Sequence, residues 1–250
     1  MSDKIEVYYF SPTGGTKKVS GIFVDAMEKE VIWHDLGSKK PMMEKPEGEM
    51  IVIAAPVFGG RIPSVVREKI EKLSGTGKKA VTIAVYGNRA YEDALLEMND
   101  ILMKCGFTVI ASGAFVAQHS MAPEVGAGRP DGEDEKEIHK FAESVKNSTA
   151  TENVHVPGNR PYKPEMNMPV TPISIPSCTM CGKCVTVCPT NAISVSDGAV
   201  ITDAEKCILC MACTHVCTEQ ARIRPLPLQQ ETEQMLGALK SVRNKNEVFL

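Results

Sequence analysis

Cysteine spacing is the feature that most limits how this chain can fold. Of the nine cysteines among the 250 residues, eight lie between Cys178 and Cys217, and Cys105 stands apart from them. The eight form two runs of spacing C-x2-C-x2-C-x3-C, and each cysteine of the second run lies 29 positions after its counterpart in the first. Such clustering indicates metal ligation and not a disulfide scaffold. We therefore expect this segment to fold around metal.

The spacing resembles that of bacterial ferredoxins that carry two 4Fe-4S clusters. Pro189 follows the first run as in that family, while Thr218 replaces the second proline, a departure that leaves ligation intact. The resemblance implies that the fourth cysteine of each run binds the cluster of the other run. The implied ligands are Cys178, Cys181, Cys184 and Cys217 for one cluster, and Cys207, Cys210, Cys213 and Cys188 for the other.

Zinc is the alternative metal, because thiolates also bind it tetrahedrally. Zinc sites typically use two separated C-x2-C pairs, whereas here three cysteines fall within seven residues, which favours an iron–sulfur cluster. This part of the chain is too small for a large apolar core, so we expect metal to hold it together. A small hairpin is expected at residues 193–201, with its turn at Asp197-Gly198.

Residues 1–150 show short apolar segments that alternate with stretches of helical periodicity. Strands are expected at 5–10, 31–34, 51–55, 80–86 and 107–116, and helices at 19–30, 64–73, 91–104 and 133–146. Apolar strands alternating with amphipathic helices are typical of a parallel sheet covered on both faces. The predicted fold class is α/β, with a doubly wound parallel sheet of five strands.

The loop after the first predicted strand has the composition of a phosphate-binding loop. It reads Ser11-Pro12-Thr13-Gly14-Gly15-Thr16-Lys17 and leads into a predicted helix. Its glycines let backbone N–H groups approach an anion, its hydroxyls add donors, and the helix dipole favours negative charge. The loop matches neither the triphosphatase nor the dinucleotide glycine pattern. The alternative is an ordinary turn in which a Ser or Thr caps the helix.

With the form S/T-x-T-G-x-T, this loop resembles that of the flavodoxin-like FMN-binding family. The resemblance implies that the loops after the third and fourth strands enclose the isoalloxazine ring, although each of them alone also fits an ordinary turn. The implied FMN contacts are Ser11, Thr13, Gly14, Gly15 and Thr16, then Pro56, Val57, Phe58, Gly59 and Gly60, then Tyr86, Gly87, Asn88, Arg89 and Tyr91.

Four further side chains are considered for roles of their own. Arg61 and Arg89 either stabilise a reduced, anionic flavin or form surface ion pairs. His119 follows the fifth predicted strand and either contacts flavin or, as we favour, is a solvated loop residue. Cys105 is expected to be a small packing residue.

A proline-rich segment separates the two halves, with six prolines between positions 155 and 176. This composition predicts a stiff, extended connector, and its length predicts that it wraps along the first domain. The predicted domains are the flavodoxin-like residues 1–150, the linker 151–173, the two-cluster residues 174–225 and the tail 226–250. Apolar spacing in the tail predicts a packing helix at 229–244.

Charge and hydropathy exclude several classes of partner. The formal net charge is −3, so no nucleic-acid partner is expected. No apolar run approaches the ~18 residues of a membrane span, and the first residues do not form a signal sequence. A cytoplasmic location is expected.

Together the halves resemble the flavodoxin–ferredoxin fusion proteins of anaerobic bacteria. Because iron–sulfur clusters transfer single electrons while FMN takes one or two, the resemblance implies an electron relay between two 4Fe-4S clusters and FMN. Its expected partners are redox proteins such as a ferredoxin, a flavoprotein or an oxidoreductase. The alternative is an FMN-dependent reductase of a small substrate, fed by its own clusters, so enzymatic activity stays open. A homodimer is expected if the linker holds the cofactors too far apart within one chain.

Overall fold

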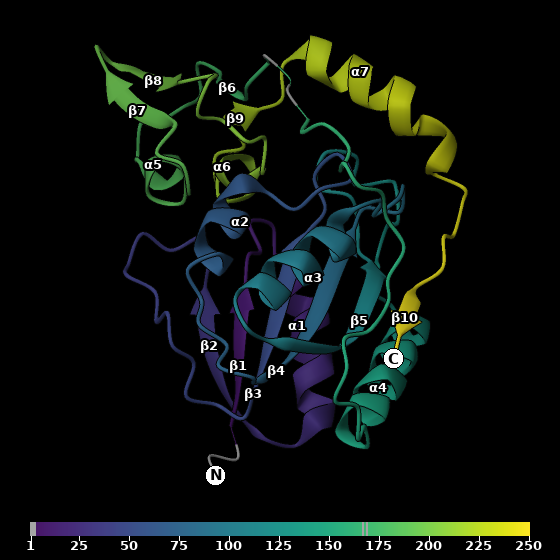
Figure 1. Ribbon diagram of the computed structural model, residues 1–250. Helices are drawn as coiled ribbons and strands as arrows, with labels where there is room; N and C mark the ends of the chain where they lie inside the picture. The colour runs from purple at the N-terminus through teal and green to yellow at the C-terminus, as the bar shows by residue number, and fades with distance from the viewer. Residues whose placement is uncertain (1–3, 167, 169) are drawn as a thin grey trace.

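The computed structural model describes residues 4–166, 168 and 170–250 (Figure 1). Residues 1–3 lie outside this range, as do Asn167 and Pro169 of the predicted linker. The elements of the first 150 residues are β1 (Lys4–Tyr9), α1 (Gly15–Met27), β2 (Glu30–Asp35), β3 (Met50–Pro56), α2 (Ser64–Ile70), β4 (Lys79–Tyr86), α3 (Ala94–Lys104), β5 (Thr108–Val116) and α4 (Gly132–Lys146). The α/β class and its strand–helix alternation are confirmed.

The strands form one sheet in the order β2-β1-β3-β4-β5, all parallel, with a further strand, β10 (Glu247–Phe249), antiparallel to β5. The order of the parallel strands is that of flavodoxin-like sheets. The five predicted parallel strands are confirmed, and β10 is an additional antiparallel strand that was not predicted. The helix predicted at 229–244 was wrong in extent, because the tail is helical only at residues 226–239 and ends as the sixth strand.

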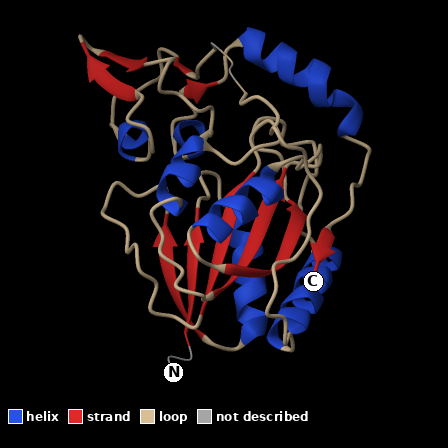
Figure 2. Ribbon diagram, in the orientation of Figure 1, coloured by secondary structure: helices blue, strands red, loops and turns tan. Residues whose placement is uncertain are grey.

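Helices cover both faces of the sheet, as Figure 2 shows. On one face Phe141 of α4 packs against Phe23 of α1 and against Phe115 of β5, at ring-centroid distances of 5.4 and 5.7 Å. On the other face α2 and α3 bury Val66 and Leu95 against β3 and β4. Because both faces are covered, β3 is buried along almost its whole length, which explains its unbroken apolar sequence.

Residues 173–239 lie over the carboxyl ends of the parallel strands (Figure 1). Their elements are β6 (Ile173–Ser174), α5 (Lys183–Thr186), β7 (Ile193–Ser196), β8 (Ala199–Thr202), α6 (Ala212–His215), β9 (Arg222–Ile223), α7 (Leu226–Leu236) and a 3-10 turn (Gly237–Leu239). The expected hairpin is β7–β8. Its turn residues Asp197 and Gly198 have φ of 50° and 71°, as a type I′ turn requires.

The proline-rich segment wraps along the sheet domain, as its length predicts. The Asp93 carboxylate, next to α3, accepts hydrogen bonds from the backbone N–H groups of Asn159 (2.8 Å) and Lys163 (2.7 Å). About two turns further along α3, Asp100 binds the guanidinium of Arg160 through two hydrogen bonds of 2.8 and 2.5 Å. Two acidic residues therefore fix the path of the linker.

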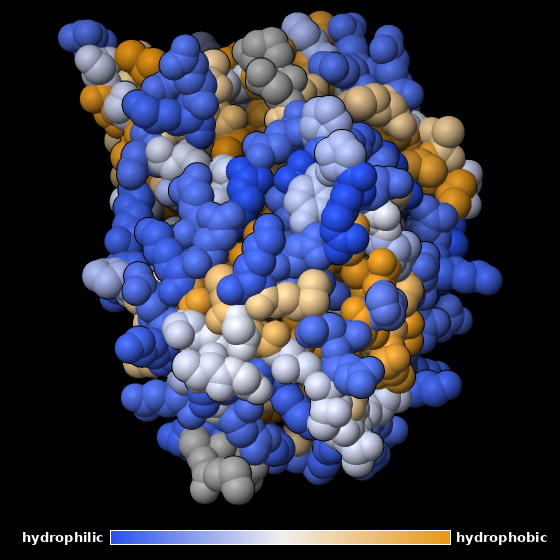
Figure 3. All heavy atoms as spheres, in the orientation of Figure 1, coloured by the Kyte–Doolittle hydropathy of each residue, from blue (hydrophilic) through white to orange (hydrophobic). Residues whose placement is uncertain are grey.

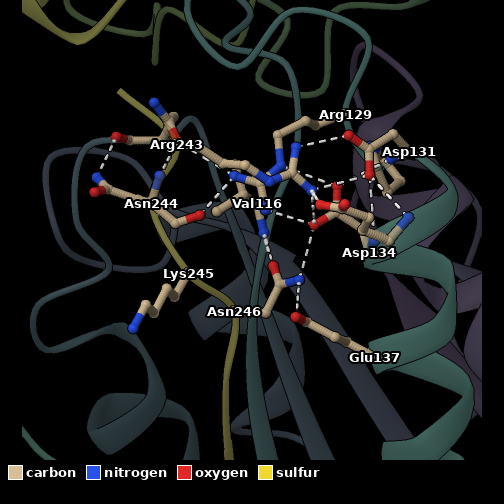
Figure 4. A network of polar contacts seen from close by, with 12 residues as sticks. Val116, Arg129, Asp131, Asp134, Glu137, Arg243, Asn244, Lys245 and Asn246 are labelled. Carbon is tan, nitrogen blue, oxygen red and sulfur yellow. Dashed lines mark hydrogen bonds and ion pairs between the residues drawn. The ribbon is translucent and has the colours of Figure 1, made fainter. Parts of the chain in front are cut away.

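The C-terminal residues are held by a polar network at the start of α4 (Figure 4). Arg129 forms a buried ion pair with Asp134 and donates a hydrogen bond of 2.7 Å to the carbonyl of Asn244. Asn246 donates to Asp134 (2.9 Å) and accepts from the backbone N–H of Val116 (2.9 Å). These contacts guide the tail onto the edge of the sheet, where β10 pairs with β5.

Polar residues dominate the face in Figure 3, and apolar residues gather over α7 and beside β10. Leu226 and Met235 of α7 are 63% and 52% exposed, and Leu250 after β10 is 63% exposed. Among the described residues, none of the helices has the length and apolar character required to cross a bilayer.

Candidate functional site

A cavity of about 660 Å³ lies where the parallel strands end. Its walls come from the loops after β1, β3, β4 and β5, from the linker, from the second cysteine run and from α7. The lining residues are Ser11, Pro12, Thr13, Gly15, Thr16, Pro56–Gly60, Val85–Gly87, Arg89, Ala90, Ala117–Met121, Lys163–Met166, Met168, Leu209, Glu231, Met235 and Leu236. This is the edge at which doubly wound sheets bind their ligands.

The loop after β1 is shaped for an anion. Gly14 precedes α1 with φ of 90°, a left-handed conformation that favours glycine, and the backbone N–H of Lys17 donates 2.9 Å to Ser11 Oγ. A Cβ on Gly15 would stand 3.2 Å from Cβ of Ala117, so little space remains for a side chain there. The 13-residue α1 directs its N-terminus at the cavity, where its dipole favours negative charge. The loop fits a phosphate group.

The loop after β3 brings the linker close over the cavity. Gly59 and Gly60 have φ of 60° and 93°. A Cβ on Gly59 would lie 2.7 Å from Cβ of Met166, and one on Gly60 would collide with the carboxylate of Glu92. Gly59 is thus required by the approach of the linker and Gly60 by the approach of Glu92, and both are favoured by the turn itself.

Most of the predicted FMN contacts line the cavity, but Gly14, Asn88 and Tyr91 are not among its lining residues. The fully buried Asn88 accepts a hydrogen bond of 3.0 Å from the N–H of Asn244 and donates one of 2.7 Å to the carbonyl of Val242. Tyr91 donates 2.7 Å to Glu247. Both side chains hold the C-terminal tail. Their partners in the tail lie more than 150 positions away in the sequence, so no local pattern around Asn88 or Tyr91 predicts these contacts.

His119 lines the cavity, contrary to the solvated position we favoured from the sequence. Burial lowers its pKa to about 4, with smaller effects from Arg224 and Arg89, so the ring is neutral at pH 7. Its Nδ1 lies 3.1 Å from the backbone N of Met121 and accepts that N–H. The remaining ring nitrogen, Nε2, therefore carries the proton and is a hydrogen-bond donor.

The two arginines considered from the sequence form ion pairs. Arg61 pairs with the buried Glu97 through hydrogen bonds of 2.8 and 2.5 Å and is not among the lining residues of the cavity. Arg89 pairs with Glu92 at 2.7 Å and does line the cavity. Cys105 is partly buried, with its thiol 3.6 Å from the carbonyl of Ile70, as a packing residue would be.

The eight clustered cysteines surround two smaller cavities. Cys178, Cys181, Cys184 and Cys217 line one of them. Cys188, Cys207, Cys210 and Cys213 line the other. Each cavity thus takes three cysteines from one run and the fourth from the other. Within residues 4–166, 168 and 170–250, no three His, Cys, Asp or Glu side chains are grouped as ligands of a single ion.

The thiols lie in surroundings that disfavour a free thiolate. Burial raises the pKa of Cys210 to about 12, and it also raises the pKa of Cys207 and Cys213. Metal ligation requires the thiolate, so a positively charged group must compensate for burial in this cavity. Four cysteines around a cavity fit an iron–sulfur cluster better than a single ion.

Leu209 joins the second cysteine cavity to the large cavity. This residue lies between Cys207 and Cys210 and lines both spaces. It packs in an apolar cluster with Met121, from the loop after β5, and with Leu228 of α7. Neither Leu209 nor α7 was identified as part of the site from the sequence, because their position depends on how the two halves pack together.

Residues 177–221 match the sequence family described as a 4Fe-4S dicluster domain. The chain is 45% identical over 56 residues to the polyferredoxin-like subunit of an aliphatic sulfonate oxidoreductase of Pyrococcus furiosus. The matched region covers 22% of this chain and 30% of that subunit. It is also 37% identical over 54 residues to Ferredoxin-1 of Rhodobacter capsulatus, and that matched region covers 19% of this chain and 83% of the ferredoxin.

Solved structures resemble the other part of the chain. Flavodoxin 1 from Bacillus cereus superposes with a TM-score of 0.45 at 18% identity, covering 58% of this chain and 99% of the flavodoxin. A short-chain flavodoxin associated with a PDU bacterial microcompartment gives a TM-score of 0.47 at 18% identity, covering 60% of this chain and 100% of that one.

Proposed function

Because this chain belongs, through residues 177–221, to the 4Fe-4S dicluster ferredoxin family, we propose that it relays electrons between two 4Fe-4S clusters and FMN. The observation that carries the proposal is the common wall at Leu209, which separates a cavity lined by four cysteines from the large cavity at the carboxyl ends of the sheet. Redox proteins are the proposed external partners.

The two cysteine cavities supply the proposed cluster ligands. In this assignment one cluster is held by Cys178, Cys181, Cys184 and Cys217, and the other by Cys207, Cys210, Cys213 and Cys188. The second set lies against the sheet domain, since Cys210 packs in the same apolar cluster as Tyr86. We infer that this cluster is the one next to the flavin, and that the first set faces external partners, because Cys181 is exposed.

The large cavity supplies the proposed FMN site. The loop from Ser11 to Thr16 would hold the phosphate, and the loops around Gly59 and Gly87 would enclose the ring. When bound, FMN supplies a centre that accepts one or two electrons. His119 would donate a hydrogen bond through Nε2, and the buried Leu209 excludes water from the wall that faces the clusters.

The walls of the cavity bear on the choice between a relay and a reductase. The linker residues 163–166 and α7 form part of the wall, so protein would cover part of a flavin bound there. Of the three side chains that a reductase could direct at its substrate, Arg61 is held by Glu97 outside the cavity, whereas His119 and Arg89 line it. Electron transfer requires only proximity, whereas a second substrate requires an open face over the ring.

Anaerobic reduction tests the relay. We expect a ferredoxin-reducing system to bleach the cluster absorption first and the flavin absorption after it, at a rate independent of protein concentration. Dependence on concentration would instead indicate transfer between two chains. Flavin that stays oxidised beside two reduced clusters, when the measured potentials permit transfer, would refute the proposal.

A further inference from the structure

Arg222 is a buried cation next to the cysteine cavities. It lies in β9, immediately after residues 177–221, and only 4% of its surface is exposed. The matching position in the first repeat, 29 residues earlier, is Ile193. The two repeats thus have the same cysteine spacing, but only the second carries a charged residue at this position.

Two hydroxyl groups fix the Arg222 guanidinium. Its Nη1 donates 3.1 Å to Ser174 Oγ of β6, and its Nη2 donates to Thr202 Oγ1 of β8. Its Nε is the one buried side-chain nitrogen or oxygen without a hydrogen-bond partner in the part of the chain that the structure describes. The Nε–H group of this fixed guanidinium is therefore a donor without an acceptor.

A buried cation without a counter-charge is costly, and a buried donor without an acceptor adds to the cost. Among the described residues, no carboxylate forms an ion pair with Arg222. Its side chain lines the cavity of Cys178, Cys181, Cys184 and Cys217. A cluster with four thiolate ligands is anionic overall, and its sulfur atoms are hydrogen-bond acceptors.

The field of Arg222 reaches both cysteine runs. The thiols of Cys184 and Cys213 both lie within the field of Arg222, whose side chain also forms a hydrogen bond to Cys213. Only the first of these cysteines lines the same cavity as Arg222. Because Arg222 lines this cavity and not the cavity of Cys213, the stronger effect is expected at the cluster proposed for the first cavity.

We propose that Arg222 sets the reduction potential of the cluster held by Cys178, Cys181, Cys184 and Cys217, by its charge and by an Nε–H hydrogen bond to a cluster sulfur. Reduction adds one electron and one negative charge to the cluster, and a fixed cation stabilises that reduced form. Charge and hydrogen bonds to sulfur are established determinants of cluster potential. The proposal rests on the ligand assignment of the proposed function.

Redox titration of the two clusters by electron paramagnetic resonance, in the full-length anaerobic protein, tests this inference. We expect Arg222→Gln to make one cluster at least tenfold harder to reduce, which is about 59 mV for a one-electron couple, and to change the other less. Arg222→Lys keeps the charge and should give a smaller shift. Lys183→Gln is the matched control, because it removes an exposed, solvent-screened cation from the rim of the same cavity.

Iron and acid-labile sulfide are measured for every variant. A wild type without clusters would contradict the proposed function itself. Loaded variants whose potentials move no more than that of Lys183→Gln would refute only the role of Arg222. Loss of one cluster from both Arg222 variants would also refute it, because the residue would then be structural.

Discussion

His119 illustrates how the surroundings of a single side chain determine its chemistry. The residue type alone fits a charged or a neutral ring near pH 7. The backbone N–H of Met121 occupies Nδ1, and burial disfavours the charged form, so a neutral ring with its proton on Nε2 results. The ring can donate a hydrogen bond into the cavity and carries no charge there.

The lowered pKa of His119 predicts a pH dependence of stability. Its pKa is about 4 in the folded protein against about 6.5 in the unfolded chain, so on acidification the unfolded state takes up the proton first. Stability present above pH 6.5 is therefore lost as the pH falls toward 4. Between pH 7.5 and 6 the free energy of unfolding should fall about 1 kcal/mol more in the wild type than in His119→Gln.

Urea unfolding followed by circular dichroism under anaerobic conditions measures this difference. His139→Gln, which removes an exposed histidine of α4, is the control and should behave as the wild type does. Equal pH dependence in the wild type and in His119→Gln would show that His119 titrates normally in the folded protein.

Among the elements, the linker is the segment whose role depends most on its neighbours. Asp93 and Asp100 hold its first part along α3, and its next residues, 163–166, then form part of the cavity wall. The pKa of Asp93 is lowered although burial opposes this, because the N–H groups of Lys163 and Asn159 donate to its carboxylate. The Asp93 carboxylate therefore holds the linker where residues 163–166 begin to line the cavity.

Asp93→Ala should weaken FMN binding by about tenfold. The substitution removes hydrogen bonds to a charged group, worth about 1.5–3 kcal/mol each, and part of that loss is expected to free the linker from the cavity. Flavin fluorescence titration of the apoprotein measures the dissociation constant. Asp25→Ala, on the exposed surface of α1, should leave it unchanged. Unaltered affinity in Asp93→Ala would mean that the linker does not contribute to the site.

Elements with strong periodicity could be predicted from the sequence, and those that depend on distant partners could not. The strands and helices up to α4 and the β7–β8 hairpin follow from apolar spacing and turn residues. The three residues of β10 have no periodicity of their own and are a strand only because β5 offers an open edge. The same tail takes Asn88 and Tyr91 away from their predicted roles.

Across the whole molecule, the two cysteine runs differ in how they contact the sheet domain. Cys210 and Ala212 of the second run pack in the large apolar cluster that contains Tyr86 and Leu95. The first run contributes Cys184 and Val185 only to a small cluster with Ala192, Ile193 and the cysteines around them. That small cluster gives little apolar support, so the first run depends most on metal.

Removal of iron should therefore unfold residues 177–221, beginning with the first cysteine run, and leave the sheet folded. After anaerobic chelation, hydrogen exchange in this segment should approach the rate of an unstructured peptide, while β3 and β5 stay protected. Mass spectrometry of peptic peptides measures both regions in one experiment. Unchanged protection of residues 177–221 in the iron-free protein would show that the apolar contacts suffice.

The candidate site was predictable to the extent that its parts are local. The glycine-rich loop from Ser11 to Thr16 and the cysteine spacing are short motifs, and each lines a cavity. Leu209, Arg222 and α7 acquire their positions from the packing of segments far apart in the chain. Nothing in the local sequence around Leu209 distinguishes it from an ordinary core leucine.

The lining of the large cavity is of two kinds. Turns that contain glycine, at the ends of β1, β3 and β4, form one part of it, and the thioether side chains of Met121, Met166, Met168 and Met235 form another. Methionine is unbranched and polarizable, so it follows changes in the outline of its neighbour at low energetic cost. If a bound group changes its shape between charge states, we expect these methionine side chains to follow that change.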